Sequence, residues 1–336
     1  MKFTHPRYSR FARTLRAWLP GLAVSLLALG AQGTLAQQPW PAKPIKVIVP
    51  YDAGQGTDII GRYVANELGK ELNQSVFVEN RPGAGGNIGT QIAARAAPDG
   101  YTFMIGTNGT HAANSFLYRK LGFDPQADFE PVAMIGVLPL VFVTQPDSPI
   151  STVPELQRAA HSKPESLNIA ISTTTSRMAY ELFKSQGEAP MFPVDFKGSA
   201  QAAMAVIGGQ VEYMVDTIAS LRSAIQSDQV KPLGVTLHSS SKLLPGVKSL
   251  AEQGIADYEL VGWVAMYAPK GTPTDVLSTL SASMERILEQ PDVQNRLMQL
   301  GMEPKPMSRE ELQRFGVSER EKWGSLIRNA GLQQAN

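Results

Sequence analysis

The sequence is constrained most by short β-branched runs that each lead into a turn of glycine and small polar residues, after which a helical pattern begins. Strand and helix patterns alternate in this way along most of the chain, which is typical of α/β folds with mostly parallel sheets. The strand-like runs are 45–50, 75–78, 102–105, 132–143, 167–171, 211–215, 230–237 and 259–268. The helix-like segments are 58–72, 154–160, 176–184, 200–207 and 273–289, with helical sequence continuing almost throughout after them.

Four of the turns between strands and helices stand out as candidate binding elements. They are 51–58, 81–89, 106–114 and 172–177. A turn at a helix N-terminus exposes backbone N–H groups, and the helix dipole favours an anion there. Ligands of open α/β sheets bind beyond the carboxyl ends of the strands, so the four turns are expected to meet at one cleft. The sequence therefore predicts a cleft suited to a carboxylate or a phosphate.

The first 36 residues have the pattern of an export signal. They contain five basic residues and no acidic one, followed by an apolar run over 19–30 and small residues up to Ala36. A bilayer core of about 30 Å requires about 20 apolar residues, so this run is too short for an anchor. We predict a secretory signal peptide over 1–36 that is cleaved near Ala36.

Charge and cysteine content narrow the function classes further. Removing the five basic residues of the signal from the 31 in the chain leaves 26 against 30 acidic residues, a net charge of −4. A protein with this charge has no basic footprint for nucleic acid. The sequence contains no cysteine, which excludes disulfides, thiolate metal sites and the lipidated cysteine of a lipoprotein. We expect a soluble periplasmic protein that is not a lipoprotein.

Motifs for catalysis and cofactors are missing from the sequence. Neither glycine turn completes the dinucleotide fingerprint, and the phosphate-loop pattern is absent. The three histidines that follow the signal have no metal-ligand spacing, and there is no nucleophile elbow. A Ser-His-Asp triad assembled across the fold remains open. We predict no catalytic residue, no metal and no cofactor.

Several segments together carry a resemblance to a known family. They are 40–50, 54–58, 78–89, 97–102, 106–111, 196–199, 209–210 with Asp216, and 268–273. The segment Val78-Glu-Asn-Arg-Pro-Gly-Ala-Gly-Gly-Asn-Ile-Gly89 and the residues up to Thr102 are the most specific. With these segments the chain resembles the receptors of tripartite tricarboxylate transporters, the Bug- or TctC-like periplasmic solute-binding proteins. The resemblance covers essentially all of the chain after the signal.

The resemblance implies a two-lobed periplasmic-binding-protein fold of the flytrap type. Each lobe would be a mostly parallel sheet flanked by helices, with two strands crossing between the lobes. We expect one lobe from 37–140 plus 258–336 and the other from 141–257. Such a receptor closes on a small carboxylated metabolite without transforming it. Its expected partners are integral-membrane transporter subunits, and we expect the receptor itself to be a monomer.

The resemblance also implies which residues hold the ligand, partly through ordered waters. They come from the four turns, from the segment before the helix-like run at 200–207, and from the position directly after the strand-like run at 211–215. The predicted ligand-binding residues are Tyr51, Asp52, Ala53, Gly54, Gly56, Thr57, Gly85, Thr107, Asn108, His111, Asn114, Ser172, Thr173, Thr174, Ser176, Arg177, Lys197, Gly198, Ser199 and Asp216.

Two residues depart from the family pattern and bear on the ligand. Arg177 stands where many relatives have histidine, and an arginine there can bind a second carboxylate in a bidentate pair. Asp52 adds a carboxylate to the first turn, which is costly beside an anion unless the ligand carries a cation. The hypothesis is a dicarboxylate or an acidic amino acid. The alternative is that both side chains point to solvent or pair with other residues.

Two other functions stay open at this point. The protein could present its ligand to a sensor kinase instead of a transporter, which would change only the partner. It could also be a secreted hydrolase or isomerase on a similar scaffold, which would consume its substrate and require a perturbed acid or base in the cleft.

Overall fold

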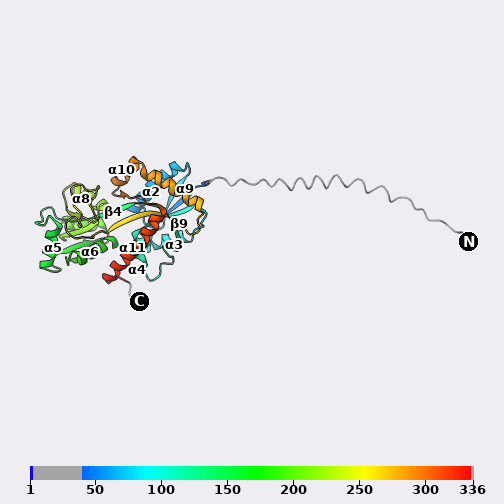
Figure 1. The fold of residues 1–336 in the computed structure, drawn as a ribbon. Helices are drawn as coiled ribbons and strands as arrows, with labels where there is room; N and C mark the ends of the chain where they lie inside the picture. Colours follow the sequence, from blue (N-terminus) through cyan, green and yellow to red (C-terminus); the bar gives the residue numbers. More distant parts are fainter. Residues whose placement is uncertain (3–39, 334–336) are drawn as a thin grey trace. The chain divides into compact units, whose positions relative to one another are not determined.

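Strands and helices alternate along the chain in the computed structural model, which describes residues 1, 2 and 40–333 (Figure 1). The strands are β1 (Ile45–Val49), β2 (Val76–Asn80), β3 (Thr102–Thr107), β4 (Phe129–Thr144), β5 (Asn168–Ile171), β6 (Phe192–Asp195), β7 (Tyr213–Thr217), β8 (Lys231–Val235), β9 (Val261–Pro269) and β10 (Glu303–Pro304). The helices are α2 (Gly56–Glu71), α3 (Asn87–Ala94), α4 (Asn114–Leu117), α5 (Val153–Ser162), α6 (Thr174–Gln186), α7 (Ser199–Ile207), α8 (Ile218–Gln226), α9 (Thr274–Glu289), α10 (Pro291–Gln299) and α11 (Arg309–Asn329). A 3₁₀ turn η1 (Ala84–Gly86) and a π-helix η2 (Gly109–Ala113) complete the elements.

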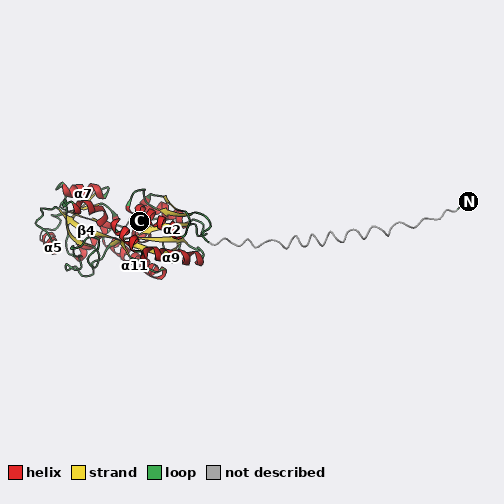
Figure 2. Ribbon diagram, turned by 90° about the horizontal axis from the view of Figure 1, so that it is seen from above, coloured by secondary structure: helices red, strands yellow, loops and turns green. Residues whose placement is uncertain are grey.

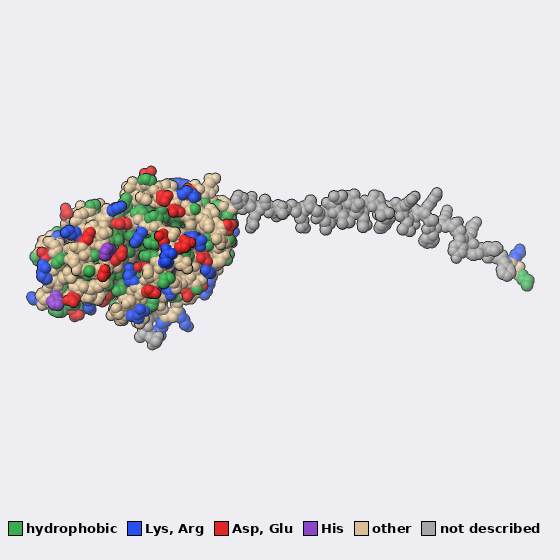
Figure 3. Space-filling model, in the orientation of Figure 1, with side chains coloured by type: hydrophobic (Ala, Val, Ile, Leu, Met, Phe, Trp, Pro, Cys, Tyr) green, Lys and Arg blue, Asp and Glu red, His purple; other side chains and the backbone are tan. Residues whose placement is uncertain are grey.

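The predicted signal peptide over 1–36, with cleavage near Ala36, lies outside the described residues apart from its first two. From Pro41 onward the described chain forms one compact unit. Among the helices of the described residues, none is both long and apolar enough to cross a membrane. Acidic and basic side chains are interspersed over the face shown in Figure 3.

The strands form one continuous sheet in the order β2-β1-β3-β9-β4-β7-β5-β6, with β8 and β10 also paired to β4. The first sheet region comprises β1, β2, β3, β9, β10 and the beginning of β4. The second sheet region comprises β5, β6, β7, β8 and the end of β4. Strand β4 joins the two regions, because it pairs with β9 up to Pro139 and with β7 from Leu140 onward. The chain leads back into the first region through β9. Leu260, directly before β9, donates its backbone N–H to the backbone O of Thr236 at 3.0 Å.

Helices cover both regions of the sheet. Figures 1 and 2 show α2 and α9 with the first sheet region and α5 with the second, while the C-terminal helix α11 lies between them. Helix α2 buries Ile60, Val64 and Leu68, which recur at four-residue steps as the sequence pattern predicts. Burial of each such side chain stabilises the fold by roughly 1.5–3 kcal/mol. Ile45 and Val47–Val49 of β1 are fully buried, as expected for a strand covered on both faces.

The sheet is mixed and differs in this respect from the mostly parallel sheets that the alternation predicts. Strand β1 runs parallel to β2 and β3, and β5 runs parallel to β6 and β7. The long strands β4 and β9, however, run antiparallel to each other and to their other neighbours. They connect the two regions in opposite directions, so each must enter a sheet whose other strands run the opposite way.

Some elements were not predicted from the sequence. Strand β6 is a partly exposed edge strand that contains Pro193, and proline weakens the strand pattern. Helix α8 begins at Ile218, directly after β7 ends at Thr217, so no turn residues mark its start in the sequence. The π-helix η2 has no distinctive local pattern. Helices α9, α10 and α11 agree with the predicted helical segment at the C-terminus.

A buried carboxylate fastens α11 to the sheet. Glu319 is 4% exposed, and its Oε2 accepts the indole N–H of Trp263 in β9 and that of Trp323, each at 3.0 Å. Both tryptophans are fully buried. Lys322 pairs with the same carboxylate at 2.6 Å and offsets its charge. This arrangement ties the C-terminal helix to the centre of the first sheet region.

We expect Glu319→Ala to lower the free energy of unfolding by about 3 kcal/mol. The substitution leaves two buried indole donors without an acceptor, and a hydrogen bond to a charged group contributes about 1.5–3 kcal/mol. Urea denaturation of the variant measures the loss. The matched control is Glu321→Ala, which removes an exposed carboxylate from the same helix. Equal stability of the two variants would contradict the role of Glu319.

Candidate functional site

The first glycine-rich turn is held in place by one buried carboxylate. Asp58 Oδ2 accepts the backbone N–H of Gly54 at 2.8 Å and Nε of Arg62 at 3.0 Å, and Asp58 Oδ1 accepts Asn80 Nδ2 at 2.8 Å. Asn80 Nδ2 also donates to Tyr51 O at 3.0 Å. Burial acts to raise the pKa of Asp58, but the bonds from Arg62, Gly54 and Asn80 outweigh it and lower the pKa below its ordinary value.

The same turn leaves the start of helix α2 accessible. Asp52, Ala53, Gly54 and Gly56 are exposed, and no side chain caps the first turn of the helix. Gly54 has a φ of +85°, which favours glycine. A Cβ at Gly54 or Gly56 would meet nothing within 4 Å. The predicted anion cradle is therefore open to a ligand.

The second turn packs against the first and third. A Cβ on Gly86 would lie 2.8 Å from Thr110 Cγ2 and 3.4 Å from the ring of Tyr51. Asn114 Nδ2 donates to Gly85 O at 3.0 Å and to Asn87 Oδ1 at 2.7 Å. The side chain of Asn114 therefore positions the second turn.

Hydroxyl groups connect the first and third turns. Tyr51 and Thr107 share a hydrogen bond of 2.7 Å between their hydroxyl oxygens, and the backbone N–H of Thr107 donates to Thr110 Oγ1 at 3.0 Å. Burial raises the pKa of Tyr51, so its phenol remains protonated at neutral pH. The turn continues into the π-helix η2. Such segments are rare in proteins, and those that occur often lie at functional sites.

Asn108 reaches from the third turn to the second sheet region. Its Nδ2 donates to Thr175 Oγ1 in the first turn of α6 at 3.0 Å, and its Oδ1 accepts the backbone N–H of Trp263 at 3.3 Å. The side chain of Asn108 is buried. This bond brings together two of the predicted turns that are far apart in the sequence.

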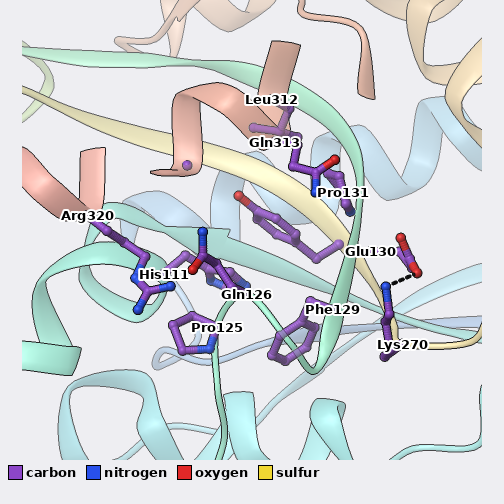
Figure 4. Close-up of a pocket in the computed structure, with 12 residues that line it drawn as sticks. His111, Pro125, Gln126, Phe129, Glu130, Pro131, Lys270, Leu312, Gln313 and Arg320 are labelled. Atoms are coloured by element: carbon purple, nitrogen blue, oxygen red, sulfur yellow. Dashed lines mark ion pairs between the residues drawn. The ribbon is translucent and has the colours of Figure 1, made fainter. Parts of the chain in front are cut away.

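His111 lies apart from the other predicted residues. Its ring stacks on Tyr267 at a centroid distance of 4.0 Å and contacts Phe129 at 5.0 Å. Burial, and then the charge of Arg320, lower the pKa of His111 to about 3. The ring lines a cavity that none of the other predicted site residues lines (Figure 4).

The fourth turn is organised by side-chain caps. Thr173 and Ser176 form a reciprocal capping box at the start of α6. Ser172 donates to Asp216 Oδ2, and Asp216 Oδ1 accepts the backbone N–H of Thr217 at 2.6 Å. These bonds join the end of β5 to the end of β7. Thr174, at the outer side of the turn, is exposed.

Arg177 is already paired. Its guanidinium contacts Asp195 Oδ1 at 2.6 Å and Glu181 Oε1 at 3.8 Å. The Arg177 side chain is 17% exposed, whereas that of Asp195 is 74% exposed. Arg177 lines a surface depression with Ser172, Thr173 and Thr174, and Leu117 at the end of α4 borders the same depression.

The last predicted group lies at the start of α7. Lys197 is exposed, and Gly198 precedes the helix without a side-chain cap. A Cβ at Gly198 would meet nothing within 4 Å. Like α2, this helix begins without a side-chain cap and presents an accessible N-terminus.

Sequence analysis missed the residues that position these turns. Asp58 could have been found, because an acidic residue in the first turn of a helix commonly accepts nearby N–H groups. Thr175 lies in the predicted turn 172–177 but is not among the predicted ligand-binding residues. Asn80, Thr110 and Asp195 have no local signal, because each acts through a partner that is distant in the sequence or on a neighbouring turn.

The family of the chain follows from comparison with known proteins. The model of the tripartite tricarboxylate transporter family receptor, TctC, matches residues 60–332. The chain belongs to this receptor family. A Pseudomonas protein from the tcbD–tcbE intergenic region is 33% identical over 317 residues, which are 93% of this chain and 93% of that protein. The predicted family is thereby confirmed.

Solved structures of relatives share the fold. A protein of R. palustris with adipate has a TM-score of 0.77 and 31% identity, over 87% of this chain and 98% of that one. The periplasmic binding protein BugD has a TM-score of 0.73 and 30% identity, over 88% and 100%. MatC from Rhodopseudomonas palustris with bound malate has a TM-score of 0.71 and 30% identity, over 86% and 100%. The chain thus has the α/β periplasmic-binding-protein fold, in a family of binding proteins and not of enzymes.

We expect Asp58→Asn to destabilise the TctC receptor by about 2 kcal/mol at pH 7. The asparagine side chain has one acceptor oxygen, whereas the Asp58 carboxylate accepts hydrogen bonds from three donor groups. Hydrogen bonds to a charged group contribute about 1.5–3 kcal/mol each. The pKa of Asp58 is lowered on folding, so its stabilisation is complete above the unfolded pKa of about 3.9 and is lost as the pH falls through the folded pKa.

Urea denaturation at pH 7 and at pH 3 tests this dependence on pH. The difference between the wild type and Asp58→Asn should shrink at the lower pH. Asp52→Asn is the matched control, because Asp52 is an exposed carboxylate in the same turn. An unchanged difference between the two pH values would show that the charge of Asp58 does not stabilise the turn.

Proposed function

We propose that this TctC receptor works in the periplasm, after removal of residues 1–36, and captures a small dicarboxylate or an acidic amino acid for a tripartite tricarboxylate transporter. In this proposal the receptor is a monomer. A lobe of residues 37–140 and 258–336 closes with a lobe of residues 141–257 on the ligand. The ligand is bound and released unchanged.

The bond between Asn108 and Thr175 carries the proposal. It spans 3.0 Å and joins a binding turn of one proposed lobe to the helix that begins at the binding turn of the other. The Tyr51 and Thr107 hydroxyls and the accessible N-terminus of α2 belong to the same group of turns. Donors from both proposed lobes are thereby available to one carboxylate.

The position of Arg177 favours a ligand that has a second carboxylate. The exposed side chain of Asp195 is its main partner, and water can solvate that carboxylate when it is displaced. A distal ligand carboxylate can therefore replace Asp195 in the ion pair at small net cost. The relatives described with adipate and with malate were solved with dicarboxylates, which agrees with this ligand class.

Asp52 separates the two candidate ligand classes. Its side chain is exposed in the first turn, close in sequence to the proposed carboxylate cradle. An ammonium group on the ligand would be attracted to Asp52, whereas a plain dicarboxylate would be repelled by it. An acidic amino acid should lose affinity in Asp52→Asn, and a dicarboxylate should gain it.

A thermal-shift panel tests the proposed ligand class. The protein is expressed as the full chain, purified, unfolded and refolded to remove bound metabolites, and mixed with mono-, di- and tricarboxylates and with aspartate and glutamate. A ligand at 100 times its Kd adds about 2.7 kcal/mol and should raise the Tm by several degrees. Recovery of the ligand unchanged supports a receptor. No shift with any carboxylate, or a consumed compound, would refute the proposal.

Arg177→Gln should weaken binding of the identified ligand by about tenfold or more, because a charge-assisted contact contributes about 1.5–3 kcal/mol. Isothermal titration calorimetry measures the change in Kd. The matched control is Lys184→Gln, which removes an exposed positive charge further along α6. An Arg177→Gln affinity within threefold of the wild type would remove Arg177 from the proposed site.

A further inference from the structure

A second cavity lies outside the proposed binding cleft. It has a volume of about 210 Å³ and is bordered by α11, by the start of β4 and by the end of β9. Apolar walls come from Phe129, Tyr267 and Leu312, all of which are buried. One water molecule takes about 30 Å³ in the liquid, so the volume suits a small organic molecule.

Two buried polar groups face this cavity without a hydrogen-bond partner. They are the His111 ring, through its Nε2, and the Arg320 guanidinium, through its Nε and Nη1. His111 is 3% exposed. Figure 4 shows Arg320, His111 and Gln126 together at one end of the cavity. Buried donors, and charged ones above all, almost always have a partner in native proteins.

The other charges near the cavity are already engaged. Glu130 and Lys270 form an ion pair of 2.7 Å at the opposite end in Figure 4, and Arg309 approaches Glu130 at 3.8 Å. Asp124 experiences the charge of Arg320, but its Oδ1 accepts the backbone N–H groups of Gln126 and Ala127 at 2.8 and 3.1 Å. Asp124 keeps its negative charge in these bonds, but among the described residues no carboxylate lies within ion-pair distance of Arg320.

The hydrogen bonds of His111 define what its free nitrogen offers. Nδ1 lies 2.9 Å from Thr110 Oγ1, whereas the other acceptor of the Thr110 hydroxyl, Thr107 O, is 3.3 Å away. In the tautomer in which the Thr110 hydroxyl donates to Nδ1, the proton of the neutral ring is on Nε2. Nε2–H and the Arg320 guanidinium are then both donors into the cavity.

We propose that this cavity is a second binding site, which takes a small organic carboxylate with an apolar body. Arg320 and His111 Nε2–H bind the carboxylate, and Phe129, Tyr267 and Leu312 contact the apolar part. The site differs from the proposed cleft in its lining residues and in its chemistry, because Nε and Nη1 of its arginine have no partner in the part of the chain that the structure describes. His111 adjoins Thr110 of the third turn, so an occupant would also hold η2 in place.

Histidine NMR tests the proposal with benzoate and butyrate as probes. In nitrogen-15-labelled protein, the ring signals of His111 are followed during titration, with the exposed His161 and His238 as internal references. We expect a saturable shift of the His111 Nε2–H signal at up to millimolar probe and no shift of the His161 and His238 rings. Absence of a saturable His111 shift with both probes would overturn the proposal.

Two variants locate the binding. Arg320→Gln removes the charge, and Gly316→Met places a side chain where a Cβ meets nothing within 4 Å at the cavity wall. Both should weaken probe binding by at least about tenfold, whereas Arg314→Gln, at an exposed position of the same helix, should not. Gly316→Met removes no polar group, so it remains informative if Arg320→Gln fails to fold.

The remaining outcomes are also decisive. Unchanged probe affinity in Gly316→Met would place the bound probe elsewhere and overturn the proposal. Chloride and sulfate are titrated in parallel, and an equal His111 shift with them would replace the organic carboxylate by a small inorganic anion and overturn the proposed ligand class. Loss of probe binding in Gly316→Met with retained binding of the cleft ligand supports two separate sites.

Discussion

The position of the proposed binding turns depends on Trp263. Its indole N–H donates to the buried carboxylate of Glu319 in α11, and its backbone N–H donates to Asn108 in the third turn. Asn108 in turn binds Thr175 at the start of α6. One residue near the start of β9 thus connects the C-terminal helix, the first sheet region and the proposed binding turn of the second. The buried Glu319 is tolerated because two indoles and Lys322 satisfy it, which is the condition for a stable buried charge.

A second buried carboxylate, that of Asp58, has a different structural role. A turn that presents backbone N–H groups to a ligand needs small, accessible residues, and such residues make few contacts that would fix the conformation of the turn. Asp58 fixes the conformation of the turn, because its two oxygens accept hydrogen bonds from Gly54, Arg62 and Asn80. The space beside the glycines of the turn stays open. The rigidity of the turn and its accessibility therefore come from different residues.

The sequence predicts local structure well where one segment carries the signal. Helix α2 follows from the spacing of its buried residues, and the four turns follow from the glycines and hydroxyls after each strand. The antiparallel direction of β4 and β9 is not visible locally, because strand periodicity is the same for both directions of pairing. His111 shows the same limit within the site. It belongs to a predicted turn, yet its ring stacks on Tyr267, a contact that depends on a strand more than 150 residues away.

The two arginines near the ligand turns differ in one physical respect that separates their proposed roles. Arg177 is neutralised by the exposed Asp195, so a ligand carboxylate exchanges with a partner that water readily solvates. Such an exchange suits a receptor that must release its ligand, and it favours anions over neutral molecules without tight binding. Arg320 has Nε and Nη1 buried without a partner, so an anion beside it removes a desolvation cost that the protein otherwise carries. An anion at Arg320 should therefore act as part of the fold, whereas an anion at Arg177 should act as a transient ligand.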